Sequence, residues 1–163
     1  MKRIICIILL VFVTFGVSLN ASAADRFQWI HSTDTTTYKI DSLRFIVTHD
    51  ENWVYFDSWI ILDYNAQGAA NWINIRKENN LTTKGYENLD HTLEHIIYAI
   101  SKDYRIMSKD LYFADYAFDG SVLDSWTFRN SKFIDAVPKS TGEAVALATL
   151  NFAIENNIKS TPK

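Results

Sequence analysis

The chain has 163 residues, of which 48% are hydrophobic and 14% aromatic, and its formal net charge is −3. This composition is typical of one globular domain with its own core. The acidic balance argues against nucleic-acid binding, which needs basic stripes that face phosphate.

Residues 1–23 are predicted to be a secretory signal peptide. A short basic start leads into an apolar run at residues 4–19, and a small-x-small cleavage pattern follows at residues 21–23. A membrane anchor is the alternative, but the run is shorter than the roughly 20 residues that a spanning helix needs. Removing the signal would lower the net charge from −3 to −5 and take away Cys6, the only cysteine. We therefore expect a single exported domain at residues 24–163, without disulfides, which is periplasmic, on the cell surface or secreted.

Four strands are predicted in the first part of this domain. Residues 27–31 and 35–40 are rich in aromatic and β-branched side chains and flank a turn cluster. Residues 45–47 are a weaker candidate. The strongest strand is WVYFDSWIILDY at residues 53–64, where alternate side chains form one apolar face and one mixed face.

The mixed face of residues 53–64 carries Trp53, Tyr55 and Trp59. These side chains could form an aromatic recognition surface. Because large aromatic residues are mostly buried, we favour the alternative that residues 67–79 or the C-terminal helix cover them. Residues 67–79 themselves fit a short helix or a strand, and a helix is favoured. A polar loop at residues 80–90 follows.

The rest of the domain is organised around residues 93–128, which are predicted to form three consecutive antiparallel strands. Residues 92–101 form the first strand, residues 104–117 the second, and residues 122–128 return after the tight reversal at Asp119-Gly120. A helix over residues 91–107 is the alternative, but the aromatic and β-branched content favours strands.

A C-terminal helix is predicted by Ser140 and Glu143, which have the spacing of a capping box. Residues 144–154 are apolar on nearly all sides, so we expect this helix to be buried on more than one side; it could lie across the sheet and also face a second subunit. The predicted fold is therefore α+β, with an antiparallel meander of about five to six strands and the C-terminal α-helix packed on one face.

The order of these features resembles the surface-adhesin protein E family of exported bacterial proteins. The similarity spans nearly the whole mature chain and is carried by Trp29-Ile30, Tyr38-x-Ile40-Asp41, the 53–64 strand, Arg76-Lys77, Leu81, Gly85-Tyr86, Tyr104-Arg105-Ile106-Met107-Ser108, Asp119-Gly120-Ser121-Val122-Leu123, Ile134 and Pro138-x-Ser140-x-Gly142-Glu143.

The resemblance implies a surface or periplasmic binding module without enzymatic activity, whose adhesin members bind host matrix or plasma proteins. It places ligand binding in the basic strand region, here Lys102, Arg105 and Lys109. The acidic residues among them dilute that charge, and a solvated hairpin edge is the alternative. Relatives often tie a strand to the helix with a cysteine pair. Ile100 stands at that strand position, so burial must replace the bond.

One motif points to catalysis. His91, Glu94 and His95 match H-x-x-E-H, an inverted zinc-peptidase signature that requires a helix. On a strand the two histidines would lie about 13 Å apart, too far to share one ion. We therefore expect no metal, no cofactor and no catalytic residue.

The other candidate residues are isolated. His31 and His49 have no partners nearby in the sequence, and Asp57 and Asp63 would lie about 20 Å apart on one strand. The leading hypothesis is an exported binding module with a protein partner. The alternatives are a periplasmic envelope protein that acts through its own dimer or another envelope protein and, more remotely, a zinc hydrolase.

Overall fold

A computed structural model describes residues 26–163, so the predicted signal peptide lies outside the described residues. In chain order, these residues form β1 (Phe27–Ser32), β2 (Thr36–Asp41), β3 (Ile46–His49), β4 (Trp53–Tyr64), α2 (Ala66–Glu78), a 3-10 turn (Tyr86–Asn88), β5 (Leu89–Ser101), β6 (Ile106–Ala117), β7 (Val122–Thr127), β8 (Ile134–Asp135), α3 (Thr141–Glu155) and β9 (Thr161–Pro162).

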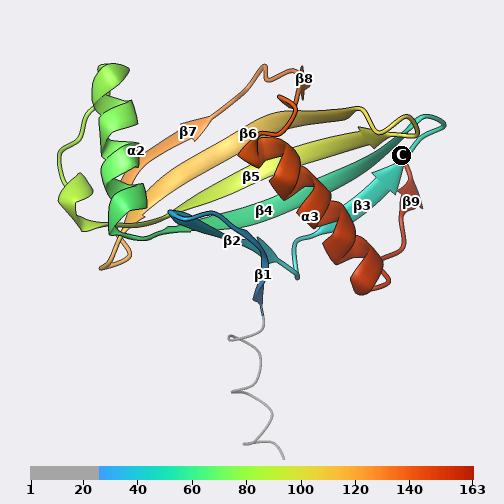
Figure 1. Cartoon of the computed structure of the whole chain (residues 1–163), viewed down its shortest axis with the longest axis horizontal. Coiled ribbons are helices and arrows are strands. Elements are labelled where there is room, and N and C mark those ends of the chain that lie inside the picture. The colour runs from blue at the N-terminus through green and yellow to red at the C-terminus, as the bar shows by residue number, and fades with distance from the viewer. Residues whose placement is uncertain (1–25) are drawn as a thin grey trace, which may run out of the picture.

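The strands form one open sheet with the order β1-β2-β4-β5-β6-β7 (Figure 1). All neighbours on this path are antiparallel, and β4, β5 and β6 are its long central strands. The predicted meander is β5-β6-β7, and the α+β fold class is confirmed. The short strands β3, β8 and β9 extend the sheet along its edges, with β9 parallel to β3.

The core lies between one face of the sheet and α3. Phe56 and Ile60 of β4 and Ile96 of β5 point to this side and are nearly or fully buried with Val145 and Phe152 of α3. Even-numbered residues of β4 and β5 therefore face the helices, as strand alternation requires. Burial of these side chains is the main source of stability in a domain without disulfides.

Helix α3 begins at the predicted cap. The Ser140 side chain accepts a hydrogen bond from the Glu143 N–H, while Glu143 Oε2 accepts one from the N–H of Lys139. The outer side of this helix has no cover from residues 26–163: Leu147 and Ile154 remain 38% and 63% exposed there. The helix is buried only where it faces the sheet.

Residues 66–78 form a helix, as favoured, and this helix lies on the same face of the sheet as α3. Asn65 caps α2 by accepting the N–H of Gly68. Trp72 reaches Asp115 of β6, which lies on the helix-bearing face beside Thr92. Figure 1 shows α2 and α3 in front of the same sheet, over its two halves.

The opposite face carries no helix from residues 26–163. The expectation that α2 or α3 covers Trp53, Tyr55 and Trp59 is therefore wrong. These odd-numbered residues of β4 point away from both helices, because the aliphatic even-numbered face is the one that forms the core. None of the helices in residues 26–163 is long and apolar enough to cross a membrane.

Candidate functional site

The helix-free face of β4, β5 and β6 carries rows of side chains in register. One row contains Trp59, His95 and Tyr112, and a second row further along the strands contains Asp63, His91 and Tyr116. We call the half-buried residues of these strands that point away from the helices the aromatic face; they are Trp53, Tyr55, Asp57, Trp59, Ile61, Asp63, His91, Leu93, His95, Ile97, Lys109, Tyr112 and Tyr116.

Rings on the aromatic face stack across strands. The Trp59 and His95 rings are 4.4 Å apart at 10°, and Tyr112 lies 5.9 Å from Trp59. His91 stacks on Tyr116 in the same way, at 4.9 Å and 11°. These five rings are therefore each packed against a neighbour before any partner binds.

Charged side chains contact the rings and carboxylates of the aromatic face. The His95 Nε2 atom lies 2.6 Å from Asp57 Oδ1, and the Arg44 guanidinium lies 5.4 Å from the Trp59 ring centre. Lys39 pairs with Asp63. The aromatic face is thus a mixed surface, with apolar rings beside carboxylates, imidazoles and cations.

The three residues of the H-x-x-E-H motif do not meet. His91 and His95 lie on the aromatic face, where each contacts its own carboxylate, Asp90 or Asp57. Successive residues of a strand point to opposite faces, and Glu94 is an odd number of residues from each histidine. Glu94 therefore points to the opposite, helix-bearing face. Within residues 26–163, no three His, Cys, Asp or Glu side chains come together as metal ligands could.

The three predicted ligand-binding cations lie in different surroundings. Arg105 is held by two hydrogen bonds to Asp135 of β8, at 2.7 and 3.0 Å. Lys109 lies on the aromatic face, 5.9 Å from the Phe133 ring. Lys102 lies in the exposed β5–β6 turn. The structure brings Lys102 and Arg105 to one hollow at the end of the sheet, and Lys109 is not among the residues that line it.

The other residues considered from the sequence have structural partners. His31 packs against the Tyr38 ring, and His49 lies 3.0 Å from the Ser160 hydroxyl, where the C-terminal strand β9 pairs with β3. Ile100 is buried in the core with α3.

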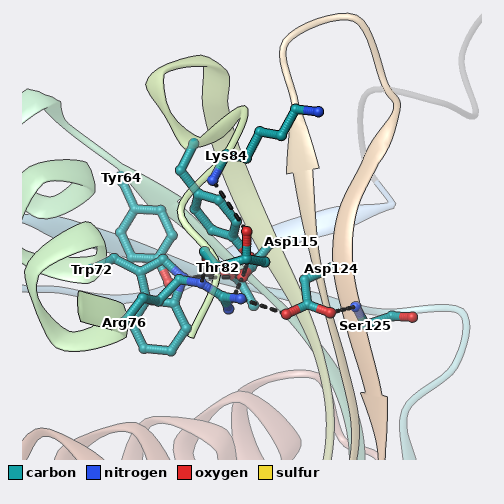
Figure 2. A network of polar contacts seen from close by, with 10 residues as sticks. Tyr64, Trp72, Arg76, Thr82, Lys84, Asp115, Asp124 and Ser125 are labelled. Atoms are coloured by element: carbon teal, nitrogen blue, oxygen red, sulfur yellow. Dashed lines mark hydrogen bonds and ion pairs between the residues drawn. The ribbon is translucent and has the colours of Figure 1, made fainter. Parts of the chain in front are cut away.

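A buried polar network fastens α2 to the other end of the sheet (Figure 2). Arg76 is 1% exposed and donates to Asp115 at 3.3 Å, to Asp124 at 2.5 Å and to the Thr82 carbonyl at 2.9 Å. Its guanidinium also lies 4.2 Å from the Tyr86 ring.

Asp115 is the centre of this network. It is fully buried and accepts hydrogen bonds from Arg76, Trp72, Tyr86 and Thr92. Burial, reinforced by this carboxylate, raises the pKa of Tyr86 well above its ordinary value. Because its donors come from α2, the 3-10 turn and β5, the network has the properties of a structural clamp rather than of a ligand site.

Glu94 is a second acid on the helix-bearing face, in different surroundings. Burial, together with the carboxyls of Asp110 and Asp115, raises the pKa of Glu94 to about 7. Two nearby phenols, Tyr38 and Tyr98, also have raised pKa values, chiefly because of burial and in part because of the Glu94 carboxylate. Glu94 therefore changes its charge near neutral pH, which makes it a candidate for pH-dependent behaviour.

Sequence reasoning missed the role of Asp115 and considered Glu94 only as part of the H-x-x-E-H motif. Asp115 and Arg76 are 39 residues apart, so no local spacing connects them. The available signal was strand parity: Thr92, Glu94 and Ile96 share a face, and the paired strand places Asp115 there. A polar residue on a core-facing position indicates either a buried partner or a shifted pKa.

No protein-family model, no curated protein and no solved structure matches this chain. The fold and the candidate site define an open antiparallel α+β sheet protein with two helices on one face and an aromatic surface on the other.

Proposed function

We propose that this chain is a non-enzymatic exported binding module that binds a protein partner through the aromatic face. The observation that supports it most is the placement of both helices on one side of the sheet, which leaves the stacked Trp, Tyr and His side chains of β4, β5 and β6 without a covering helix. The resemblance to surface-adhesin protein E supplies the partner class, which is a host matrix or plasma protein.

The chemistry of this face suits a protein interface. Tyrosine, tryptophan and arginine are enriched among residues that dominate binding energy. Trp59, Tyr112 and Arg44 provide all three within one contact cluster. Because Trp59 is already stacked on His95, little side-chain freedom is lost on binding.

Binding of residues 24–163 to an immobilised panel of matrix and plasma proteins tests the proposal. We expect binding that Tyr112→Glu abolishes, because a carboxylate on this face loses its hydration when a partner covers it. Asn71→Glu, on the exposed side of α2, is the matched control and should bind like the parent. No binding to any panel member, or equal binding by both variants, would remove the proposal.

Charge reversal separates the aromatic face from the basic residues implied by the resemblance. If Lys109→Glu weakens binding and Lys102→Glu does not, the partner lies on the face. If all three reversals at Lys102, Arg105 and Lys109 are needed, the end of the sheet takes part as well. Protection of the chain from protease added to intact cells would exclude a surface role and favour a periplasmic one.

The second candidate function is an envelope protein that acts through its own dimer or another envelope protein. The specific observation in its favour is the outer side of α3, where Leu147 and Ile154 are exposed. Trp29 of β1, which is 64% exposed, lies near Leu147. A hollow of about 390 Å³ lies between β1 and α3 there. Sedimentation of residues 24–163 discriminates the two: a dimer that Leu147→Glu dissociates supports the second candidate, and a monomer at all concentrations counts against self-association.

A further inference from the structure

A small cavity lies over the middle of β5 and β6 and the end of β7. Its volume is about 80 Å³, and the residues that line it are Glu94, His95, Asp110, Tyr112, Phe113 and Phe128. The rings of His95 and Tyr112 contact Trp59 on the aromatic face. The side chains that remain to form the walls are therefore two carboxylates and two phenyl rings, on the helix-bearing side of the sheet.

A β-bulge brings these side chains together. The register of β5 and β6 shifts in their middle, where Leu111 is an extra residue of β6. Asp110 and Phe113 are three positions apart, so they would point to opposite faces of a regular strand. The extra residue places both on the helix-bearing face, where Phe113 is paired with Glu94. Bulges often re-aim side chains in this way beside functional sites.

Two phenyl rings form the apolar part of the cavity. Phe113 of β6 and Phe128, which follows β7, are both half-buried, and their ring centres lie 6.1 Å apart at 44°. The N–H of Phe128 donates to the carbonyl of Leu111, which holds this residue beside the bulge. The π face of a phenyl ring attracts a cation, so these walls suit a positively charged group with an apolar stem.

The two carboxylates of the cavity have no counter-ion within residues 26–163. Glu94 is half-buried and Asp110 is exposed, and neither side chain has a hydrogen bond or an ion pair there. No lysine or arginine lines the cavity, and His95 is already paired with Asp57. Burial raises the pKa of both acids, and the carboxyls of Asp110 and Asp115 raise that of Glu94 further. A bound cation would compensate this negative charge.

The residue types in the cavity select the kind of cation. A divalent metal ion needs several oxygen or nitrogen ligands, and no three His, Cys, Asp or Glu side chains come together in the part of the chain that the structure describes. An alkylammonium group has three N–H donors for carboxylates and methylene groups that pack on rings. Sites for whole small molecules measure about 300–1,000 Å³, so 80 Å³ suits the end of one side chain or a very small amine.

We propose that this cavity binds a primary alkylammonium group, whose N–H groups donate to Glu94 and Asp110 while its methylene groups pack on Phe113 and Phe128. A lysine side chain of a protein and a free small amine both carry this group. The site lies on the helix-bearing side of the sheet and does not rest on the proposed function.

Binding of n-butylammonium to isotope-labelled residues 24–163, followed by amide chemical-shift titration, tests this site. The titration is made at pH 8, above the pKa of Glu94, and potassium chloride keeps the ionic strength constant. We expect saturable shifts at His95, Asp110 and Phe128, with millimolar affinity. n-Butanol has the same chain without the charge and should bind at least about tenfold more weakly.

A capped lysine distinguishes the two sources of the group. If N-acetyl-lysine-N-methylamide binds as tightly as n-butylammonium or more tightly, the site accepts a lysine side chain of a protein. If it binds more weakly than n-butylammonium, the site accepts a free amine. Either result supports an alkylammonium site.

Variants separate the charge and the rings from folding. Glu94→Gln keeps the shape of the side chain and should weaken n-butylammonium binding at least about tenfold. Glu51→Gln, in the exposed β3–β4 turn, is the matched control and should bind like the parent. Phe128→Leu keeps an apolar wall without a π face and should weaken binding about threefold. Urea unfolding of each variant verifies that it is folded.

The inference is overturned if n-butylammonium causes no saturable shift, if n-butanol binds equally well, or if Glu94→Gln or Phe128→Leu binds like the parent. The titration contains no protein partner, so its outcome is independent of binding through the aromatic face, which the panel of matrix and plasma proteins tests. A failure of one proposal is thus distinguishable from a failure of the other.

Discussion

Replacing Glu94 with glutamine should make the protein more stable at alkaline pH and leave it unchanged in acid. The pKa of Glu94 is raised from 4.5 to about 7 in the folded protein, so the folded state holds this proton more tightly than the unfolded chain does. Stability linked to Glu94 is therefore fully present below pH 4.5 and is lost as the pH rises toward 7.

The size of this effect follows from the shift. One pKa unit corresponds to about 1.4 kcal/mol, so a change from 4.5 to about 7 makes ionised Glu94 destabilising by on the order of 3 kcal/mol. Glutamine resembles the protonated acid in shape and carries no charge. Glu94→Gln should therefore gain up to about 3 kcal/mol at pH 8 and almost nothing at pH 4.

Urea unfolding at pH 4, 6 and 8, followed by tryptophan fluorescence, measures this difference. Asp110 also has a raised pKa because of burial, so the comparison must be made between variant and parent at each pH. Glu51→Gln, in the exposed β3–β4 turn, is the control and should differ little from the parent at any pH. An equal stability change for Glu94→Gln at pH 4 and pH 8 would refute the reasoning.

Two further predictions concern how α2 is held. Arg76→Met should lower the free energy of unfolding by about 3–5 kcal/mol, because Asp115 would remain buried as an uncompensated charge; the exposed neighbour variant Lys77→Met should change it by less than about 0.5 kcal/mol in the same urea titration. Gly68→Ala should cost at least about 1–3 kcal/mol in thermal unfolding, because the added Cβ would lie 2.3 Å from a backbone carbonyl oxygen. Gly142→Ala, where the nearest atom is 3.6 Å away, should be tolerated, and equal losses for both alanine variants would contradict the packing argument.

The strands were predictable where side-chain alternation was strong. Residues 53–64 form β4 with the predicted bounds, because one aliphatic face and one aromatic face repeat over the whole segment. β6 begins at Ile106 instead of residue 104, because Tyr104 adopts a positive φ that belongs to the turn. β5 begins three residues earlier than predicted, at Leu89, where the register shifts before His91.

The placement of the helices was not predictable from the same pattern. Both faces of β4 contain large apolar side chains, so composition alone does not say which one the helices cover. The decisive contacts are long-range: Phe45 contacts the Phe152 ring of α3 edge to face, and Trp72 of α2 reaches Asp115 of β6. The strain at Tyr104 was equally hidden, because a tyrosine in a turn has no sequence signature of positive φ.

The two faces of β5 carry different chemistry, and this division bears on function. Within the H-x-x-E-H stretch, alternation sends His91 and His95 to the aromatic face and Glu94 to the helix-bearing face. A hydrolytic metal site would need Glu94 on the same face as the two histidines, and it lies on the opposite one. A binding surface needs only the side chains that already share one face. Glu94 then influences stability from one side, while the imidazoles belong to the proposed binding surface on the other. For this reason a pH-dependent change in partner affinity that disappears in Glu94→Gln would trace to the folding equilibrium of the sheet.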